Sequence, residues 1–221
     1  EKERLEAMGL VTQIRKVIDV KDSFSKMNIE RKKETDRVKE IEKEKAERLK
    51  KKKQEIEQVK KEFYSLFSKD KDPHKRGKEL EAVVNKLFKV HDISVKESFA
   101  LCGDAGEGII EQIDGVIEID GIIYLVEMKW WNKPLGRPEV SQLLSSLYSR
   151  ADCRGIFISE SGFSEPAITE VKNALRDKVV ILCTLEELVC LLEKEKDLKE
   201  FLKCKVTCAV VDKNPFFVVR E

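Results

Sequence analysis

The sequence lacks the cysteine and histidine spacings that zinc sites require. None of the six cysteines forms a CxxC pair, and neither of the two histidines lies beside a cysteine cluster. The sequence therefore argues against a zinc site. Several of the cysteines lie within apolar runs, where a free thiol packs as a small core residue. This usage favours a reducing environment, and we expect a cytoplasmic protein.

Long apolar runs, a signal segment and an excess of one charge are also missing. No run is long enough to span a membrane, and no signal peptide is recognisable, so we expect no membrane association. The chain begins with Glu1 rather than Met, as a fragment of a longer protein would. The net charge of +1 does not indicate a nucleic-acid partner. A local basic patch would still suffice, because affinity for phosphate depends on where the lysines lie.

Charged residues are abundant but unevenly distributed. They form 38% of the chain, well above the usual level of about 25%. Lys and Glu dominate the first third, after which the composition is that of an ordinary α/β domain. We therefore expect a Lys/Glu-rich helical segment at 1–72, a globular domain at 73–195 and a β-like C-terminal extension at 196–221.

The absence of proline and glycine from 28–67 predicts a helix there, and the preceding residues 1–25 also carry apolar side chains at helical spacing. A heptad seam runs through the second segment but is apolar only in its second half. Its apolar members are Leu49, Ile56, Val59, Phe63 and Leu66. The seam fits a coiled coil that forms a homodimer, a higher oligomer or a link to another module. A solvated single helix held by Glu–Lys pairs explains the same pattern, and the sequence leaves both open.

The globular part alternates between helical and strand periodicity. The expected helices cover 76–90, 138–149, 165–175 and 185–193, and the expected strands cover 93–101, 113–119, 122–130, 155–159 and 179–183. A glycine-rich loop is expected at 103–108. This order predicts an α/β fold with a mixed sheet and helices on both faces. The tail is expected to form a hairpin from the β-like runs 206–211 and 216–219.

Helix starts are marked by capping residues. Asp72 is placed to cap a helix whose first residue is Pro73. Ser164 is expected to cap a later helix, and Thr184 with Glu187 forms the pattern of a capping box.

The dipeptide Asp120-Gly121 is a strong hairpin signal and fixes the register of the strands on either side. Counting outward from it, Asp114 lies opposite Glu127, unless a β-bulge near Asp114 shifts the register by one. Directly opposed side chains have Cβ atoms about 4.5–5.5 Å apart, so two carboxylates there would repel each other. A divalent cation between them is the simplest remedy. Mg²⁺ accepts one or two carboxylates and completes its shell with water and phosphate oxygens.

Lys129 lies two residues after Glu127 and therefore on the same face of the strand. Its ammonium group could orient a water molecule or stabilise charge on a phosphate. The backbone carbonyl of Met128, between them, could supply a further metal ligand. A surface strand with scattered charges is the alternative. It fits poorly, because the segment is otherwise almost wholly apolar and buried charges need partners.

The pattern Asp114…Glu127-Met128-Lys129 resembles the D…ExK core of the PD-(D/E)xK nucleases. Four blocks in order, two of which contain this pattern, resemble the Mrr-like restriction endonucleases. They are residues 76–81, 111–116, 124–130 and 154–164. The resemblance covers about residues 75–193 and implies a restriction-endonuclease-like αβββαβ core.

The resemblance also implies a DNA substrate, Mg²⁺ as cofactor with Mn²⁺ as a substitute, and further site residues. Glu81 fits the position of an additional acid on the first helix, although it could be an ordinary exposed acid. Gln142 matches a recurrent glutamine that could position a water or a phosphate, and a surface amide is an equal alternative. Lys133, Arg137 and Trp130 are candidate DNA contacts, although of the adjacent pair Trp130 and Trp131 at least one is expected to belong to the core.

Three functions follow as hypotheses. The first is a metal-dependent DNA endonuclease of restriction or phage defence. The second is a repair or recombination nuclease acting on branched or single-stranded DNA. The third is a non-catalytic module that binds DNA or a partner. The intact set of Asp114, Glu127 and Lys129 argues against the third.

Overall fold

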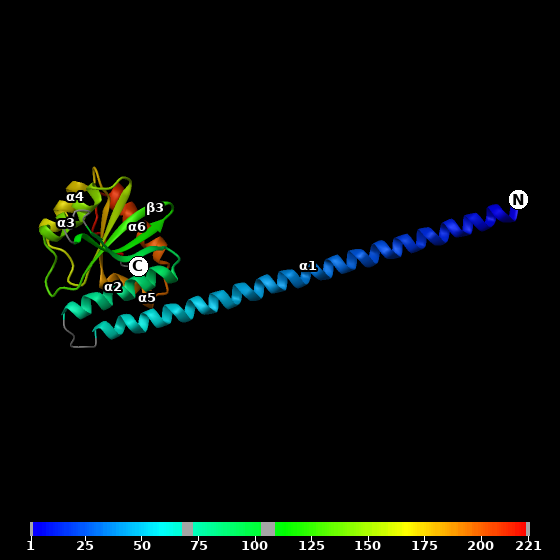
Figure 1. Cartoon of the computed structure of the whole chain (residues 1–221), viewed down its shortest axis with the longest axis horizontal. Coiled ribbons are helices and arrows are strands. Elements are labelled where there is room, and N and C mark those ends of the chain that lie inside the picture. Colours follow the sequence, from blue (N-terminus) through cyan, green and yellow to red (C-terminus); the bar gives the residue numbers. More distant parts are fainter. Residues whose placement is uncertain (1, 68–72, 103–108, 220–221) are drawn as a thin grey trace. The chain divides into compact units, whose positions relative to one another are not determined.

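The computed structural model describes residues 2–67, 73–102 and 109–219 (Figure 1). The chain divides into two compact units, Glu1–Lys53 and Gln54–Glu221. The sequence had suggested a division between residues 72 and 73. The structural division falls earlier because the last turns of the N-terminal helix pack with the globular domain. No helix of the described residues is both long enough and apolar enough to cross a membrane.

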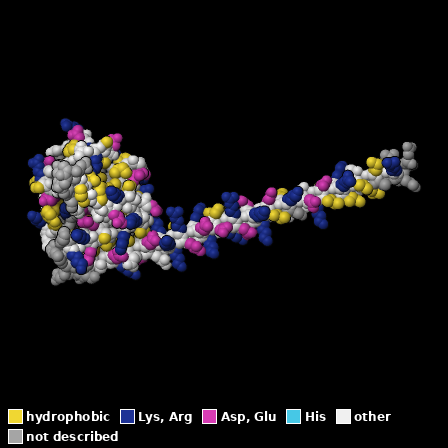
Figure 2. All heavy atoms as spheres, viewed as in Figure 1, with side chains coloured by type: hydrophobic (Ala, Val, Ile, Leu, Met, Phe, Trp, Pro, Cys, Tyr) yellow, Lys and Arg dark blue, Asp and Glu magenta, His cyan; other side chains and the backbone are white. Residues whose placement is uncertain are grey.

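Helix α1 runs from Lys2 to Phe67 without interruption, which confirms the expected N-terminal helix. Along the part of α1 that belongs to the first unit, basic and acidic side chains are interspersed (Figure 2). Among the described side chains, none before Val59 is buried. A helix of this kind is stabilised by solvated charge pairs along its surface rather than by a core of its own.

The second half of the heptad seam packs inside its own chain. Val59, Phe63 and Leu66 are buried in the core of the second unit, and Ile56 packs against that core. Leu49 remains 63% exposed. These residues are therefore not available as a continuous dimer seam, and that route to a homodimer is wrong for residues 56–66. A homodimer formed in another way stays a prediction.

The sheet has five strands in the order β1-β2-β3-β4-β5. They are β1 Ser94–Cys102, β2 Ile109–Ile119, β3 Ile122–Lys129, β4 Cys153–Ser159 and β5 Val180–Thr184. The first three strands are antiparallel neighbours, and β3, β4 and β5 are parallel. The expected mixed sheet is confirmed. The parallel strands are joined by helices because a parallel pair needs a long crossover connection.

Helices cover both faces of the sheet, as expected. They are α2 Pro73–Val90, α3 Arg137–Tyr148, α4 Glu165–Ala174, α5 Leu185–Glu193 and α6 Leu198–Val211. One hydrophobic core joins one face of the sheet to the end of α1 and to α2, α5 and α6. A second core joins the other face to α3 and α4, which lie together in Figure 1. The strand β3 lies at the centre of the sheet order and contributes to both cores.

Capping residues stand at the starts of α4 and α5. Thr184 and Glu187 form the expected capping box at α5. Ser164 is the N-cap of α4, although its side chain makes no capping hydrogen bond. Pro73 is the first residue of α2, whereas Asp72 and the glycine-rich stretch 103–108 lie outside the described residues.

The expected C-terminal hairpin is wrong. Residues 206–211 belong to helix α6, and 216–219 form no strand. The run of valines and threonine suggested a strand, but the buried residues of α6 recur at helical spacing. They are Leu198, Phe201, Leu202, Lys205 and Ala209. Burial of that stripe against the sheet outweighs the weak strand preference of the β-branched residues.

After α6 the tail covers the free edge of β5. The Leu182 amide donates to the carbonyl oxygen of Pro215 at 2.9 Å. Phe216 packs in the core beside Phe163, while Val219 packs in the core on the other face of the sheet. The tail therefore passes around the last strand and shields backbone groups that would otherwise be open to pairing with another chain.

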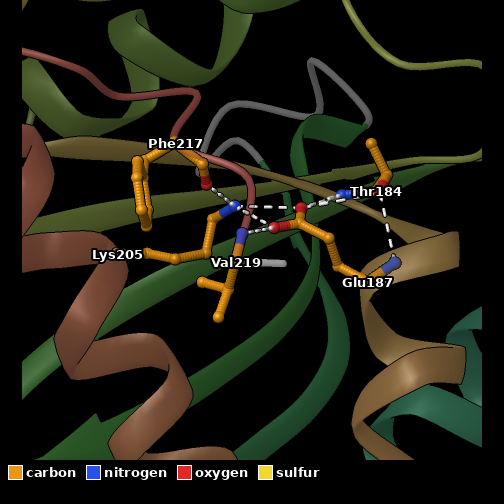
Figure 3. A network of polar contacts seen from close by, with 5 residues as sticks. All are labelled: Thr184, Glu187, Lys205, Phe217 and Val219. Carbon is orange, nitrogen blue, oxygen red and sulfur yellow. Dashed lines mark hydrogen bonds and ion pairs between the residues drawn. The ribbon is translucent and has the colours of Figure 1, made fainter. Parts of the chain in front are cut away.

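A buried ion pair fastens this tail (Figure 3). The Lys205 ammonium group donates to both carboxylate oxygens of Glu187, at 2.7 and 2.9 Å, and to the carbonyl oxygen of Phe217 at 2.7 Å. Glu187 also accepts hydrogen bonds from the backbone amides of Thr184 and Val219. Both charged side chains are almost wholly buried, so each charge compensates for the hydration that the other loses.

We expect Lys205→Met to lower the free energy of unfolding by about 3–5 kcal/mol, because it leaves the Glu187 carboxylate buried without its counter-charge. Urea denaturation would measure the loss. Lys203→Met is the matched control on the same helix. Its exposed ion pairs with Asp120 and Glu200 should contribute no more than about 1 kcal/mol. Equal losses for the two variants would contradict the structural role of the buried pair.

Candidate active site

The β2–β3 hairpin has the register that the sequence predicted. Residues pair from Ile119 with Ile122 out to Gly115 with Val126. Asp120 and Gly121 both adopt positive φ angles, of 52° and 79°, as a tight two-residue turn requires. The expected register is confirmed over this length, and it carries Asp114 and Glu127 to the same end of the hairpin.

Beyond the last paired residues of β2 and β3, the side chain of Asp114 provides the next hydrogen bond between the two strands. Its Oδ2 atom accepts a hydrogen bond from the amide of Met128 at 2.9 Å, and the residue is only 2% exposed. This contact fixes the carboxylate of β2 against the backbone of β3. Because this carboxylate is buried and hydrogen-bonded to a fixed backbone amide, its position is set before any ligand binds.

Lys129 and Glu127 complete a compact set with Asp114. The Lys129 ammonium nitrogen lies 2.6 Å from the Glu127 carboxylate and 4.0 Å from that of Asp114. The two acids therefore face the same point from neighbouring strands. Period-two alternation along β3 accounts for the shared face of Glu127 and Lys129.

These groups line a cleft of about 720 Å³. Its walls come from α2, both hairpin strands, the segment after β3, and α3. The lining residues are Gly77, Lys78, Glu81, Gln112, Asp114, Glu127, Met128, Lys129, Trp130, Trp131 and Gln142. The structure thus brings together Glu81, Gln142 and the three residues of the hairpin, which are far apart in the sequence.

The cleft concentrates negative charge. Burial, followed by the charge of Asp114, raises the pKa of Glu81 to about 7. Burial also raises the pKa of Asp114 and, together with the charge of Asp114, that of Glu127. Burial alone would lower the pKa of Lys129, but Glu127 and then Asp114 outweigh it and raise that pKa. Three acids therefore surround the Lys129 ammonium group, with Lys78 also lining the cleft, and the carboxylates gain from any further positive charge.

Comparison with known proteins adds a family to this geometry. The family model described as a restriction endonuclease, Mrr_cat, matches residues 75–192, which is more than half of the chain. The chain belongs to this restriction endonuclease family. The match begins in α2 and ends in α5, so it contains every residue that lines the cleft.

Individual relatives of this restriction endonuclease domain are distant. The type IV methyl-directed restriction enzyme EcoKMrr of Escherichia coli K12 is 38% identical over 69 residues, which are 29% of this chain and 21% of that enzyme. A crystal structure of the protein of unknown function AF1548 aligns with a TM-score of 0.41 and 20% identity, over 52% of this chain and 65% of that one.

The DNA modification-dependent restriction endonuclease AspBHI aligns with a TM-score of 0.40 and 17% identity, over 72% of this chain and 40% of that one. This chain thus spans about a fifth of EcoKMrr and less than two thirds of either solved chain.

Within this restriction endonuclease domain, the residues expected to contact DNA differ in how exposed they are. Trp130 is 7% exposed and packs against Phe67, with ring centroids 4.9 Å apart, while the Arg76 guanidinium lies 5.4 Å from its ring. This burial does not fit the expectation that Trp130 contacts DNA. Trp131 is 38% exposed and is the tryptophan of the cleft with more open surface.

The basic candidates already have neighbours. Arg137 forms an ion pair with Glu170 at 2.7 Å while its side chain remains 65% exposed. The Lys133 ammonium group lies 5.7 Å from the ring centre of Trp131, which places it beside the cleft. Their contacts with DNA stay predictions.

Sequence reasoning missed Lys78, Gln112 and Asn85. Lys78 lies in the block 76–81 and Gln112 in the block 111–116, and both line the cleft. Asn85 follows Glu81 by four residues, a spacing that places the two on one face of a helix. That spacing was the available signal, but a helical asparagine has no distinctive pattern of its own.

The donor set fits a hard divalent cation. Among the described residues, no group of three or more His, Cys, Asp and Glu side chains could hold a metal ion by itself. The proposed ligands are instead two carboxylates and a backbone carbonyl, and Mg²⁺ ordinarily takes one or two carboxylates with waters and phosphate oxygens completing its shell. The Asp114 and Glu127 carboxylates both lie within 4.0 Å of the Lys129 ammonium nitrogen, and two like charges at one point make such a cation favourable.

Proposed function

We propose that this restriction endonuclease domain hydrolyses DNA phosphodiester bonds with a divalent metal ion, Mg²⁺ in the first place and Mn²⁺ as a substitute. The observation that carries the proposal is the convergence of Asp114, Glu127 and Lys129 in one cleft of the matched domain. Asp114, Glu127 and the backbone carbonyl of Met128 are the proposed metal ligands.

The residues have separate roles in this proposal. A bound divalent ion would acidify a water molecule and offset the charge of the phosphate. Asp114 would ligate the ion, and the hydrogen bond from the Met128 amide holds its carboxylate in place. Lys129 exchanges its contact with Glu127 for one with the attacking water or a phosphate oxygen, where its charge stabilises the transition state. Glu81 acts on the same centre through water, and the amide of Gln142 positions a water or a phosphate.

We propose restriction or phage defence as the setting. The support is the family and the similarity to an enzyme whose name describes it as methyl-directed. Three acids and two lysines line the cleft, which argues against a module that only binds DNA, because acids weaken the hold on phosphate unless a cation accompanies them. A cytoplasmic location stays a prediction.

Removal of divalent metal should stop the reaction. We expect the protein to nick and linearise supercoiled plasmid in Mg²⁺ or Mn²⁺ and to leave it intact in EDTA, since the carboxylates then lack the ion that joins them to phosphate. Gel electrophoresis of methylated and unmethylated plasmid would measure both the activity and its dependence on modification. Ca²⁺ serves as the control that supports binding.

A branched DNA substrate run in parallel tests the repair alternative. Cleavage of the branched DNA with no cleavage of either plasmid would favour that alternative. Binding of DNA with no cleavage under any of these conditions would contradict the proposed hydrolysis.

A further inference from the structure

The side chain of Asn85 links the backbone of Glu81, on α2, to the backbone of Asp114, on β2. It lies on α2 with only 3% exposure. One hydrogen of its Nδ2 group is donated to the carbonyl oxygen of Glu81 at 2.9 Å, and the other to the carbonyl oxygen of Asp114 at 2.8 Å. A single amide therefore ties the helix that carries Glu81 to the strand that carries Asp114.

The orientation of this amide is forced. Both of its neighbours are carbonyl oxygens, which accept hydrogen bonds but cannot donate them, so only the Nδ2 end can face them. The Oδ1 atom is left buried without a hydrogen-bond partner among the described residues. An unpaired buried oxygen is costly, and an apolar side chain at this position would avoid that cost. The position of Asn85 is therefore explained by the two contacts of Nδ2 and not by packing alone.

Gly115 supplies the space that the amide needs. A Cβ atom at this position would lie 2.7 Å from Oδ1 of Asn85, a distance that real Cβ contacts essentially never show. The amide cannot swing away freely, because both of its hydrogens are engaged with Glu81 and Asp114. Gly115 directly follows Asp114, so a side chain here would push on the link at the point where it meets β2.

We propose that Asn85 is a positioning residue that sets the separation of Glu81 and Asp114, and that Gly115 is its steric complement. Asn85 is not among the residues that line the cleft. By fixing the two backbones it keeps both carboxylates directed at the same cleft, in the way that outer contacts orient metal ligands. This inference deepens the proposed function and rests on it.

Loss of the Asn85 link should therefore lower the affinity for a divalent metal, beyond any effect that it has on the stability of the fold. We expect Asn85→Ala to reduce the affinity for Mn²⁺ by about 10- to 100-fold, the usual effect of removing a contact that orients a ligand. The Mn²⁺ concentration required for half-maximal plasmid cleavage should rise to a similar extent. Electron paramagnetic resonance of free Mn²⁺ measures the affinity without relying on activity.

Val84→Ala is the matched control. Val84 is the neighbouring residue on α2 and is fully buried, but it belongs to the hydrophobic core and makes no polar link to the site. It should lower the melting temperature and leave the Mn²⁺ affinity within about threefold of the wild-type value. A merely structural role of Asn85 would make the two variants alike.

Gly115→Ala tests the same link from the other side. It should weaken Mn²⁺ binding when Asn85 is present, because the new methyl group displaces the amide. In the Asn85→Ala background it should add little, since the oxygen that it would strike is gone. This variant also carries the test if Asn85→Ala does not fold.

The outcomes separate this inference from the function on which it rests. A wild-type protein that binds Mn²⁺ and cleaves DNA, with both single variants unchanged, would overturn the positioning role alone. Equal loss of affinity in Val84→Ala and Asn85→Ala, or fully additive effects of Gly115→Ala, would also overturn it. A wild-type protein that neither binds Mn²⁺ nor cleaves would refute the proposed function, and the positioning role with it.

Discussion

Asp114→Asn is expected to abolish plasmid cleavage, with a loss of about 1,000-fold or more, at the upper end of what removing one electrostatic stabiliser costs. Asparagine keeps the size of the side chain and an oxygen that can accept the hydrogen bond from the Met128 amide. The substitution therefore removes the charge with little disturbance of the hairpin. A neutral amide is a much weaker partner for Mg²⁺, which prefers carboxylate oxygen.

DNA binding by the same variant should survive. A gel-shift assay in Ca²⁺ is expected to show affinity equal to or tighter than that of the wild type, because one negative charge near the phosphates has been removed. Asp152→Asn provides the same chemical change at an exposed residue before β4, outside the residues that line the cleft, and should cleave normally. Wild-type cleavage by Asp114→Asn would remove Asp114 from the ligand set.

Lys129→Met is expected to slow cleavage by about 100- to 1,000-fold while leaving Mn²⁺ binding largely intact. The ammonium group cannot ligate a metal, because it has only donors. Methionine retains an unbranched apolar stem of comparable length, so the loss is one of charge. The proposed role of Lys129 is to hold the water or the phosphate as charge develops in the transition state.

A single-turnover time course with saturating Mn²⁺ would separate slow chemistry from weak metal binding. Lys172→Met, at an exposed position on α4, is the matched control and should match the wild-type rate. If Lys129→Met also cleaves at the wild-type rate, the interpretation of Glu127-Met128-Lys129 as a catalytic motif is wrong. A module that only binds DNA would then be the better account of the cleft.

The sequence alone determined the parts of the site that depend on local geometry. Asp120 and Gly121 set the hairpin turn, and the fixed repeat of two residues along a strand then placed Asp114, Glu127 and Lys129 on one face. The capping box of Thr184 and Glu187 likewise needs only neighbouring residues. Such features can be predicted because short-range bonding decides them, whatever the rest of the chain does.

Where a sequence pattern was compatible with two different structures, the tertiary packing decided between them. The apolar stripe that includes Phe63 could have faced a second helix, but it packs in the core of its own chain. The valines of 206–211 have strand preference and nevertheless lie in α6, because the buried stripe that ends at Ala209 pairs with the sheet. Trp130 and Trp131 are adjacent and chemically identical, and only packing against Phe67 separates the buried ring from the more open one.

Asn85 shows the same limit at the site itself. Its position on α2 places it near Glu81 by helical spacing alone, but its second partner, the carbonyl of Asp114, is 29 residues away in the sequence. Local preferences are weak and carry no information on such a partner, whereas the burial of a polar amide is tolerated only where the folded chain supplies acceptors for its hydrogens. The sequence thus determined which residues could carry the chemistry, and only the folded chain decided what holds them in place.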